Sequence, residues 1–115
     1  MVDDVTGVAI NIPFEHHEIH EGNSYVACHF ASAVGSGSDA DVKVVAPNTS
    51  TRIHMFAFMS GSVEFEALIY EGGNVTAGTA LTAVNRDRNS ANAATAVCTH
   101  TPVVTTTGTL IFSGN

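Results

Sequence analysis

The sequence has no tryptophan, two tyrosines, two cysteines and only four lysine and arginine residues among 115. Because these four cations face eleven aspartates and glutamates, the formal net charge is −7, which repels a phosphate backbone. We therefore expect no nucleic acid partner. No stretch approaches the roughly 18 apolar residues that span a bilayer. The first four residues carry two acids and no basic segment, so we expect neither an export signal nor a membrane partner.

The residues that are present favour β-structure. Hydrophobic side chains make up 44% of the chain, mostly Ala, Val, Ile, Leu and Phe, while Thr and Ser recur from end to end. Small, β-branched and hydroxylated side chains suit strands rather than helices. Cys28 and Cys98 both lie in apolar, strand-like segments, where we expect free thiols. A disulfide between them is the less favoured alternative in a chain without a secretory signal.

Alternation of apolar and polar residues, or a short apolar run beside turn residues, predicts the strands. The clearest example is 63–70, where every second residue from Val63 to Ile69 is apolar. The segment 52–59 is apolar on both sides, which predicts a strand covered on both faces. Residues 77–97 also fit helical spacing, but Gly78 and several Thr and Asn residues favour short strands around a loop. The remaining expected strands cover 8–14, 25–30, 42–46, 103–104 and 110–112.

Turn-forming residues separate these strands. Turns or loops are expected at 21–23, 35–39, 72–74 and 107–108, where glycine stands beside Asn, Ser or Thr. About eight short strands with this spacing indicate an all-β fold, an antiparallel β-sandwich of jelly-roll type. We expect a single β-sandwich domain over residues 1–115, a length that fits one core. The alternative is that a C-terminal strand segment is missing after Asn115.

Histidines and carboxylates are densest in 15–21, with the sequence EHHEIHE, and both are metal-ligating types. A zinc-protease motif requires a histidine four positions after His17, where the chain has Glu21. In an extended strand, His16 and His20 share one face about two pleats apart. Completion of a metal site would require one of three distant histidines, His29, His54 and His100. We therefore expect no metal site and no cofactor, with these histidines solvated or hydrogen-bonded.

Nucleophilic catalysis has little support in the sequence. No serine lies in a Gly-x-Ser-x-Gly elbow, and both cysteines lie in apolar segments. Glu64 and Glu66 lie on the outer face of an expected strand, where a solvated sheet surface explains them better than acid and base catalysis. We expect no catalytic residues and no enzyme activity.

The polar loop 85–90, with the sequence NRDRNS, holds two of the four strong cations of the acidic chain. Arginine forms bidentate hydrogen bonds with carboxylates at interfaces, so the loop is a candidate partner contact. The alternative, which we weigh equally, is that Arg86 and Arg88 pair with acids of their own fold or of a sister subunit.

Two segments resemble those of a known family. Residues 15–25, EHHEIHEGNSY, resemble the HHE-x-H-x-G opening of small structural proteins of tailed bacteriophages, and 85–90 is similar to their NRNRNS run. The segment 45–51, VAPNTST, and the pair Gly108-Thr109 fall in the same order as in that family. Asp87 departs from the pattern, because the family has Asn at this position, and family members continue past the position of Asn115.

The resemblance implies a capsid decoration or cement protein of jelly-roll type. Such a protein binds the outer surface of the icosahedral head and stabilises contacts between subunits of the major capsid protein, without enzyme activity. We expect a homo-oligomer, a dimer or trimer, made in the host cytoplasm and located on the virion. Alternatives are a head fibre or tail protein and, less favoured, a cupin-like metal-binding enzyme. The partner-binding candidates are Arg86, Asp87, Arg88, Asn89, His16, His17 and His20.

Overall fold

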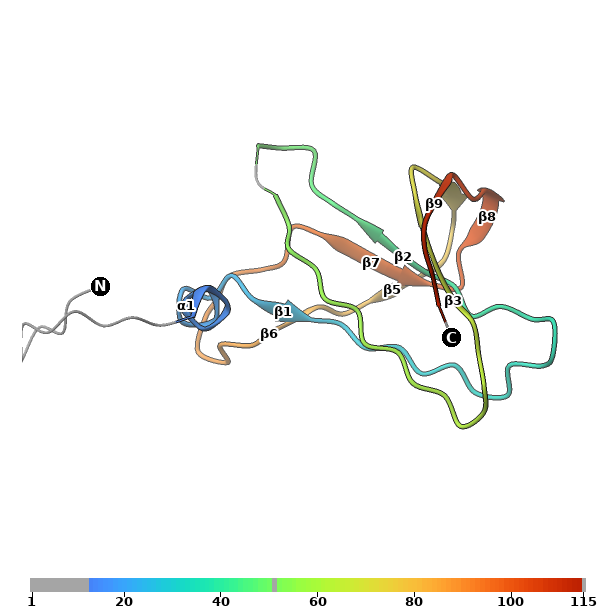
Figure 1. The fold of residues 1–115 in the computed structure, drawn as a ribbon. Coiled ribbons are helices and arrows are strands. Elements are labelled where there is room, and N and C mark those ends of the chain that lie inside the picture. Colours follow the sequence, from blue (N-terminus) through green and yellow to red (C-terminus); the bar gives the residue numbers. More distant parts are fainter. Residues whose placement is uncertain (1–12, 51, 115) are drawn as a thin grey trace, which may run out of the picture. The chain divides into compact units, whose positions relative to one another are not determined.

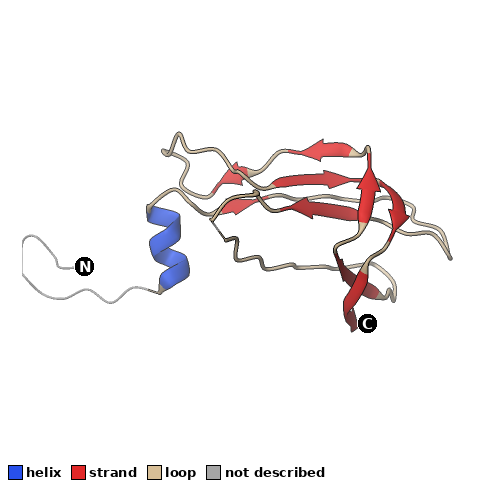
Figure 2. Ribbon diagram, turned by 90° about the horizontal axis from the view of Figure 1, so that it is seen from above, coloured by secondary structure: helices blue, strands red, loops and turns tan. Residues whose placement is uncertain are grey.

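The computed structural model describes residues 13–50 and 52–114. They form one short helix and nine strands, and every strand pair is antiparallel, which confirms the all-β class. Figure 1 labels the elements and Figure 2 distinguishes helix from strand. Their bounds are α1 (Phe14–His20), β1 (Tyr25–Val26), β2 (Val42–Val45), β3 (Ala67–Glu71), β4 (Asn74–Thr76), β5 (Thr79–Leu81), β6 (Val84–Asn85), β7 (Val97–His100), β8 (Val103–Thr106) and β9 (Thr109–Gly114).

The chain divides into two compact units, each built from two stretches of sequence. We call the described residues 13–28 and 82–94 the helix unit, which contains α1, β1 and β6. The described residues 29–50, 52–81 and 95–114 form the sheet unit, which contains the other seven strands.

The histidine run forms helix α1 and not the extended strand that we considered for it. Pro13, at the N-cap, has a φ of −55°, and a proline is tolerated there because no helical partner is needed for its missing N–H. Gly22, with a φ of +70°, ends the helix in the left-handed conformation. The amides of Gly22 and Asn23 donate to the carbonyls of Ile19 and Glu18, which closes the last turn. The turn expected at 21–23 is therefore confirmed.

The sheet unit contains small antiparallel sheets. The largest described sheet has the order β2-β7-β5, with Val44 opposite Cys98 and Cys98 opposite Leu81. Strand β3 pairs with β9, and β4 pairs with β8. The expected strands at 42–46, 103–104 and 110–112 are confirmed by β2, β8 and β9, and the short strands within 77–97 by β5 and β6.

Other expected strands differ from the structure. The strand at 25–30 shortens to β1, and that at 63–70 shifts to β3. The covered strand expected at 52–59 is wrong, because this segment is exposed and pairs with no described strand. A strand that is apolar on both faces needs cover on both, and the described residues of this chain do not supply it. Most of the strand expected at 8–14 lies outside the described residues; its last two residues are the N-cap Pro13 and the start of α1.

No apolar side chain among the described residues is fully buried. Among the large apolar side chains, the most exposed is Phe58, at 94%, followed by Phe30 at 86%. Cys28 is exposed and Cys98, in β7, is half-buried, and both are free thiols. Within the described part of the chain, no helix is long and apolar enough to cross a membrane.

Candidate partner-binding site

The helix unit joins the two segments that resemble the phage family. Strand β1 pairs with β6, so that Tyr25 lies opposite Asn85 and Val26 opposite Val84. Beyond this ladder, the amide of Arg86 donates to the carbonyl of Ser24 over 2.9 Å. The histidine-rich segment and the NRDRNS loop therefore form one structure, although they are far apart in sequence (Figure 1).

Asn85 holds this structure together. It is the only buried polar or charged side chain among the described residues, with 9% exposure. Its Nδ2 donates to the carbonyls of Gly22, over 2.8 Å, and Asn92, over 3.2 Å. Its Oδ1 accepts from the amide of Asp87 over 2.9 Å. Because its donors and acceptor are all used inside the unit, Asn85 has a structural role.

Gly22 is the point where the helix end meets the loop. Its carbonyl also accepts from the hydroxyl of Tyr25, over 3.1 Å, and from Nδ2 of Asn92, over 3.4 Å. A Cβ at this position would collide with Oγ of Ser90. The residue must therefore be glycine both for its positive φ and for this close approach. The sequence predicts a turn here, but no local pattern indicates the contribution of Asn92.

Asp87 shapes the loop rather than projecting from it. Its Oδ1 accepts from the amide of Asn89 over 2.9 Å, and its carbonyl accepts from the amide of Ser90 over 3.2 Å. A short side chain that accepts from the backbone two residues on is a common turn former. An asparagine carbonyl oxygen can accept the same bond, so the departure from the family pattern at Asp87 fits this geometry.

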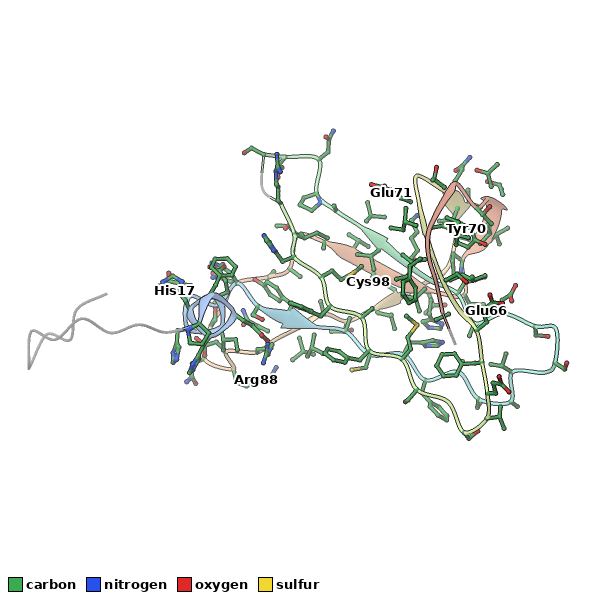
Figure 3. The ribbon with its side chains drawn as sticks, in the orientation of Figure 1. His17, Glu66, Tyr70, Glu71, Arg88 and Cys98 are labelled. Atoms are coloured by element: carbon green, nitrogen blue, oxygen red, sulfur yellow. The ribbon has the colours of Figure 1, made fainter. Side chains whose placement is uncertain are left out.

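The two arginines of the loop have different environments. Nη1 of Arg86 lies 2.7 Å from Oε1 of Glu15 in α1, and the same atom lies 3.5 Å from Oγ of Ser24. Arg88 is exposed and forms no hydrogen bond or ion pair with another described residue (Figure 3). Arg86 therefore matches the expected pairing within the fold, while Arg88, next to exposed Asn89, is available to a partner.

The three histidines of α1 form two groups. Nε2 of His16 lies 3.1 Å from Nε2 of His20, and the two rings stack with centroids 4.7 Å apart. His17 instead lies beside two carboxylates, with nitrogens 3.5 Å from Glu18 and 3.9 Å from Glu21. No group of three or more His, Cys, Asp and Glu side chains in the described part of the chain is arranged to hold a metal ion.

The other histidines and carboxylates singled out above lie in the sheet unit. The rings of His29 and His100 stack with centroids 4.1 Å apart, and Nδ1 of His100 lies 3.0 Å from Oγ1 of Thr101. Glu66 accepts a hydrogen bond from Ser113 in β9 over 3.3 Å, at an exposed position. This bond ties Glu66 to the strand structure.

No family model matches the chain, and comparison with curated proteins and with solved structures found no significant similarity. The likeness to phage structural proteins therefore depends on the sequence motifs and on their positions in the helix unit.

Proposed function

We propose that this chain is a bacteriophage capsid decoration protein that binds the outer surface of the icosahedral head and links neighbouring subunits of the major capsid protein. One observation carries the proposal. The two segments that resemble the family form a single hydrogen-bonded unit around Asn85 and Gly22, which are 63 residues apart in sequence. That the two motifs fold together supports their belonging to one surface rather than a chance likeness of two separate segments.

The loop of the helix unit supplies the contact with the capsid. Arg88 offers a planar guanidinium with five donors and has no described partner in its own chain. Carboxylates on the capsid surface are its natural ligands, and Asn89 adds a neutral donor and acceptor beside it. Arg86 and Asp87 position this contact, because the first is paired with Glu15 and the second forms the turn.

A homo-oligomer, a dimer or trimer, belongs to the same proposal. The segment 53–63 contains Phe56 and Phe58, which are 75% and 94% exposed, and carries no charged residue. Soluble monomers rarely expose contiguous apolar patches of more than a few hundred Å². Copies of this acidic chain can approach through an uncharged segment with little repulsion. Association would also complete the small sheets into the larger jelly-roll sandwich that the strand spacing predicts.

Decoration requires no chemical step. A protein that binds only the assembled shell stabilises it by mass action, by about 2.7 kcal/mol per site when its concentration is about a hundred times its dissociation constant. An oligomer that contacts several capsid subunits at once gains further affinity through avidity. Many equivalent sites on one head multiply the effect.

The test is to add the purified chain to bare heads of its phage and to measure occupancy and the melting temperature of the shell at several salt concentrations. We expect bound protein to raise that temperature. Arg88→Ala should reduce occupancy. If the arginine is desolvated in the complex, the substitution should weaken the free energy of binding by about 2–5 kcal/mol, mainly through faster dissociation. Arg52→Ala makes the same charge change at an exposed position of the sheet unit and should leave occupancy unchanged.

Two outcomes contradict parts of this proposal. Failure of the wild-type chain to bind any bare head removes the decoration function. Equal loss of binding in Arg88→Ala and Arg52→Ala removes the loop from the interface and leaves a general charge effect. Images of the particles separate decoration from a head fibre or tail protein, because these components occupy different positions on the virion.

A further inference from the structure

The helical conformation of α1 changes which histidines are neighbours. In a strand, residues four apart are separated by two pleats, whereas in a helix they lie one turn apart on the same face. His16 and His20 have this spacing, and both are exposed. Their Nε2 atoms approach to 3.1 Å, with the ring planes 29° apart. Two imidazole nitrogens thus lie side by side at the exposed surface of the helix.

This separation matches that of two ligands on one metal ion. Imidazole nitrogens bind first-row metals at about 2.0–2.1 Å. Two such nitrogens at a square-planar or tetrahedral angle are about 2.9–3.4 Å apart. We propose that His16 and His20 form an exposed two-imidazole chelating site for a late first-row divalent metal ion, which goes beyond the proposed function and does not depend on it.

The surroundings of the pair set its coordination. The nearby Glu15 is paired with Arg86 at 2.7 Å, and His17 lies beside Glu18 and Glu21, so these groups are occupied elsewhere. The described protein atoms therefore supply two ligands, and water fills the remaining positions. Open sites of this kind with two imidazoles follow the general order of affinity, so Cu²⁺ binds more tightly than Ni²⁺ or Zn²⁺.

The fold prepares the site before a metal binds. The closing turn at Gly22 and its hydrogen bond from Asn85 hold the C-terminal end of α1. His20 therefore lies on an ordered helix. A helix of seven residues is marginal by itself, and a metal ion that links one turn to the next favours the helical state. Metal binding should therefore stabilise the helix unit by mass action.

The site is tested by titrating the full-length, untagged chain with CuCl₂ and NiCl₂ in a calorimeter. We expect one Cu²⁺ per chain at this site, with imidazole nitrogens visible in the electron paramagnetic resonance spectrum. His16→Ala and His20→Ala should each weaken binding at least tenfold. His17→Ala is the matched control, because it removes an imidazole from the same helix outside the pair, and it should bind as the wild type does.

Alanine favours helices and both positions are exposed, so the variants should keep their fold, which circular dichroism checks. Hydrogen exchange gives a second readout, because Ni²⁺ should protect the amides of 17–23 in the wild type and not in His20→Ala. Acidification should release the metal, since imidazole binds it only when neutral.

Equal affinity of the wild type and His16→Ala, or loss of binding in His17→Ala, overturns the proposal. A chelator should leave occupancy on capsids unchanged, so failure here is distinct from failure of the decoration function.

Discussion

The helix unit and the sheet unit are held by different forces. The helix unit has three short elements, yet its one buried polar side chain has every partner it needs. The sheet unit has seven strands but leaves its largest apolar side chains exposed. A fully bonded polar centre specifies one arrangement without a large core, whereas apolar strands gain stability only when something covers them. Among the described residues, the polar centre of the first unit is fully hydrogen-bonded, whereas the large apolar side chains of the second are left uncovered.

The largest effect in this comparison is expected from Asn85→Asp. The carboxylate cannot donate to the carbonyls of Gly22 and Asn92, and it places a charge at a buried position. We expect a loss of about 3–4 kcal/mol from the stability of the helix unit. Hydrogen exchange of the amides in 17–28 and 82–94 of the full chain measures it. Asn89→Asp makes the same change at an exposed position and should cost far less; similar losses in both variants would show that Asn85 is not the centre of the unit.

A smaller effect is expected from Gly22→Ala. Alanine at a φ of +70° costs about 1 kcal/mol, and its Cβ would collide with Ser90, which adds about 2 kcal/mol unless the loop moves. Gly72→Ala is the control, because Gly72 has a φ of +71° with open space around it and should show the first cost alone. Thermal unfolding of both variants gives the difference. Equal melting temperatures of Gly22→Ala and Gly72→Ala would mean that the loop does not pack closely against the end of the helix.

The smallest of these effects addresses the sheet unit. Phe58→Ser should cost a folded monomer almost nothing, because the side chain is 94% exposed. If an oligomer covers it, the change should weaken association by about 2 kcal/mol per chain, the value of one buried phenylalanine. Analytical ultracentrifugation over a concentration series measures this shift, with Ser60→Ala as a neighbouring control. A wild-type chain that sediments as a monomer at every concentration would contradict the proposed homo-oligomer.

The sequence predicts the sheet unit better than the helix unit. Alternation located β2, and short apolar runs on either side of the turn residues Thr107 and Gly108 located β8 and β9. Helix α1 was missed because its residues are mostly polar and carry no apolar stripe, although Pro13 and Gly22 are helix boundary signals. The prediction for 52–59 was wrong because hydrophobicity indicates only that a segment favours burial. It does not indicate whether the same chain or another one buries it.

The candidate site shows the same division. The sequence identified the loop 85–90 and the histidine run separately, from composition and motif likeness. It did not distinguish Arg86 from Arg88, because that depends on a contact with Glu15, which is 71 residues away. Long-range contacts of this kind leave no local pattern in a single sequence.

The pairing of β1 with β6 sets an order of events during synthesis. The partner of Gly22 arrives with Asn85, 63 residues later, and the chain between them must be closed into a loop before the pair can form. At about 5–20 residues per second, a ribosome needs about 3–13 s to make that stretch. During this interval the histidine-rich segment has no loop to contact. The strands β7, β8 and β9, with which the other strands of the sheet unit pair, are made later still. Among the described strand pairs, β1 with β6 is therefore the first for which both strands are available.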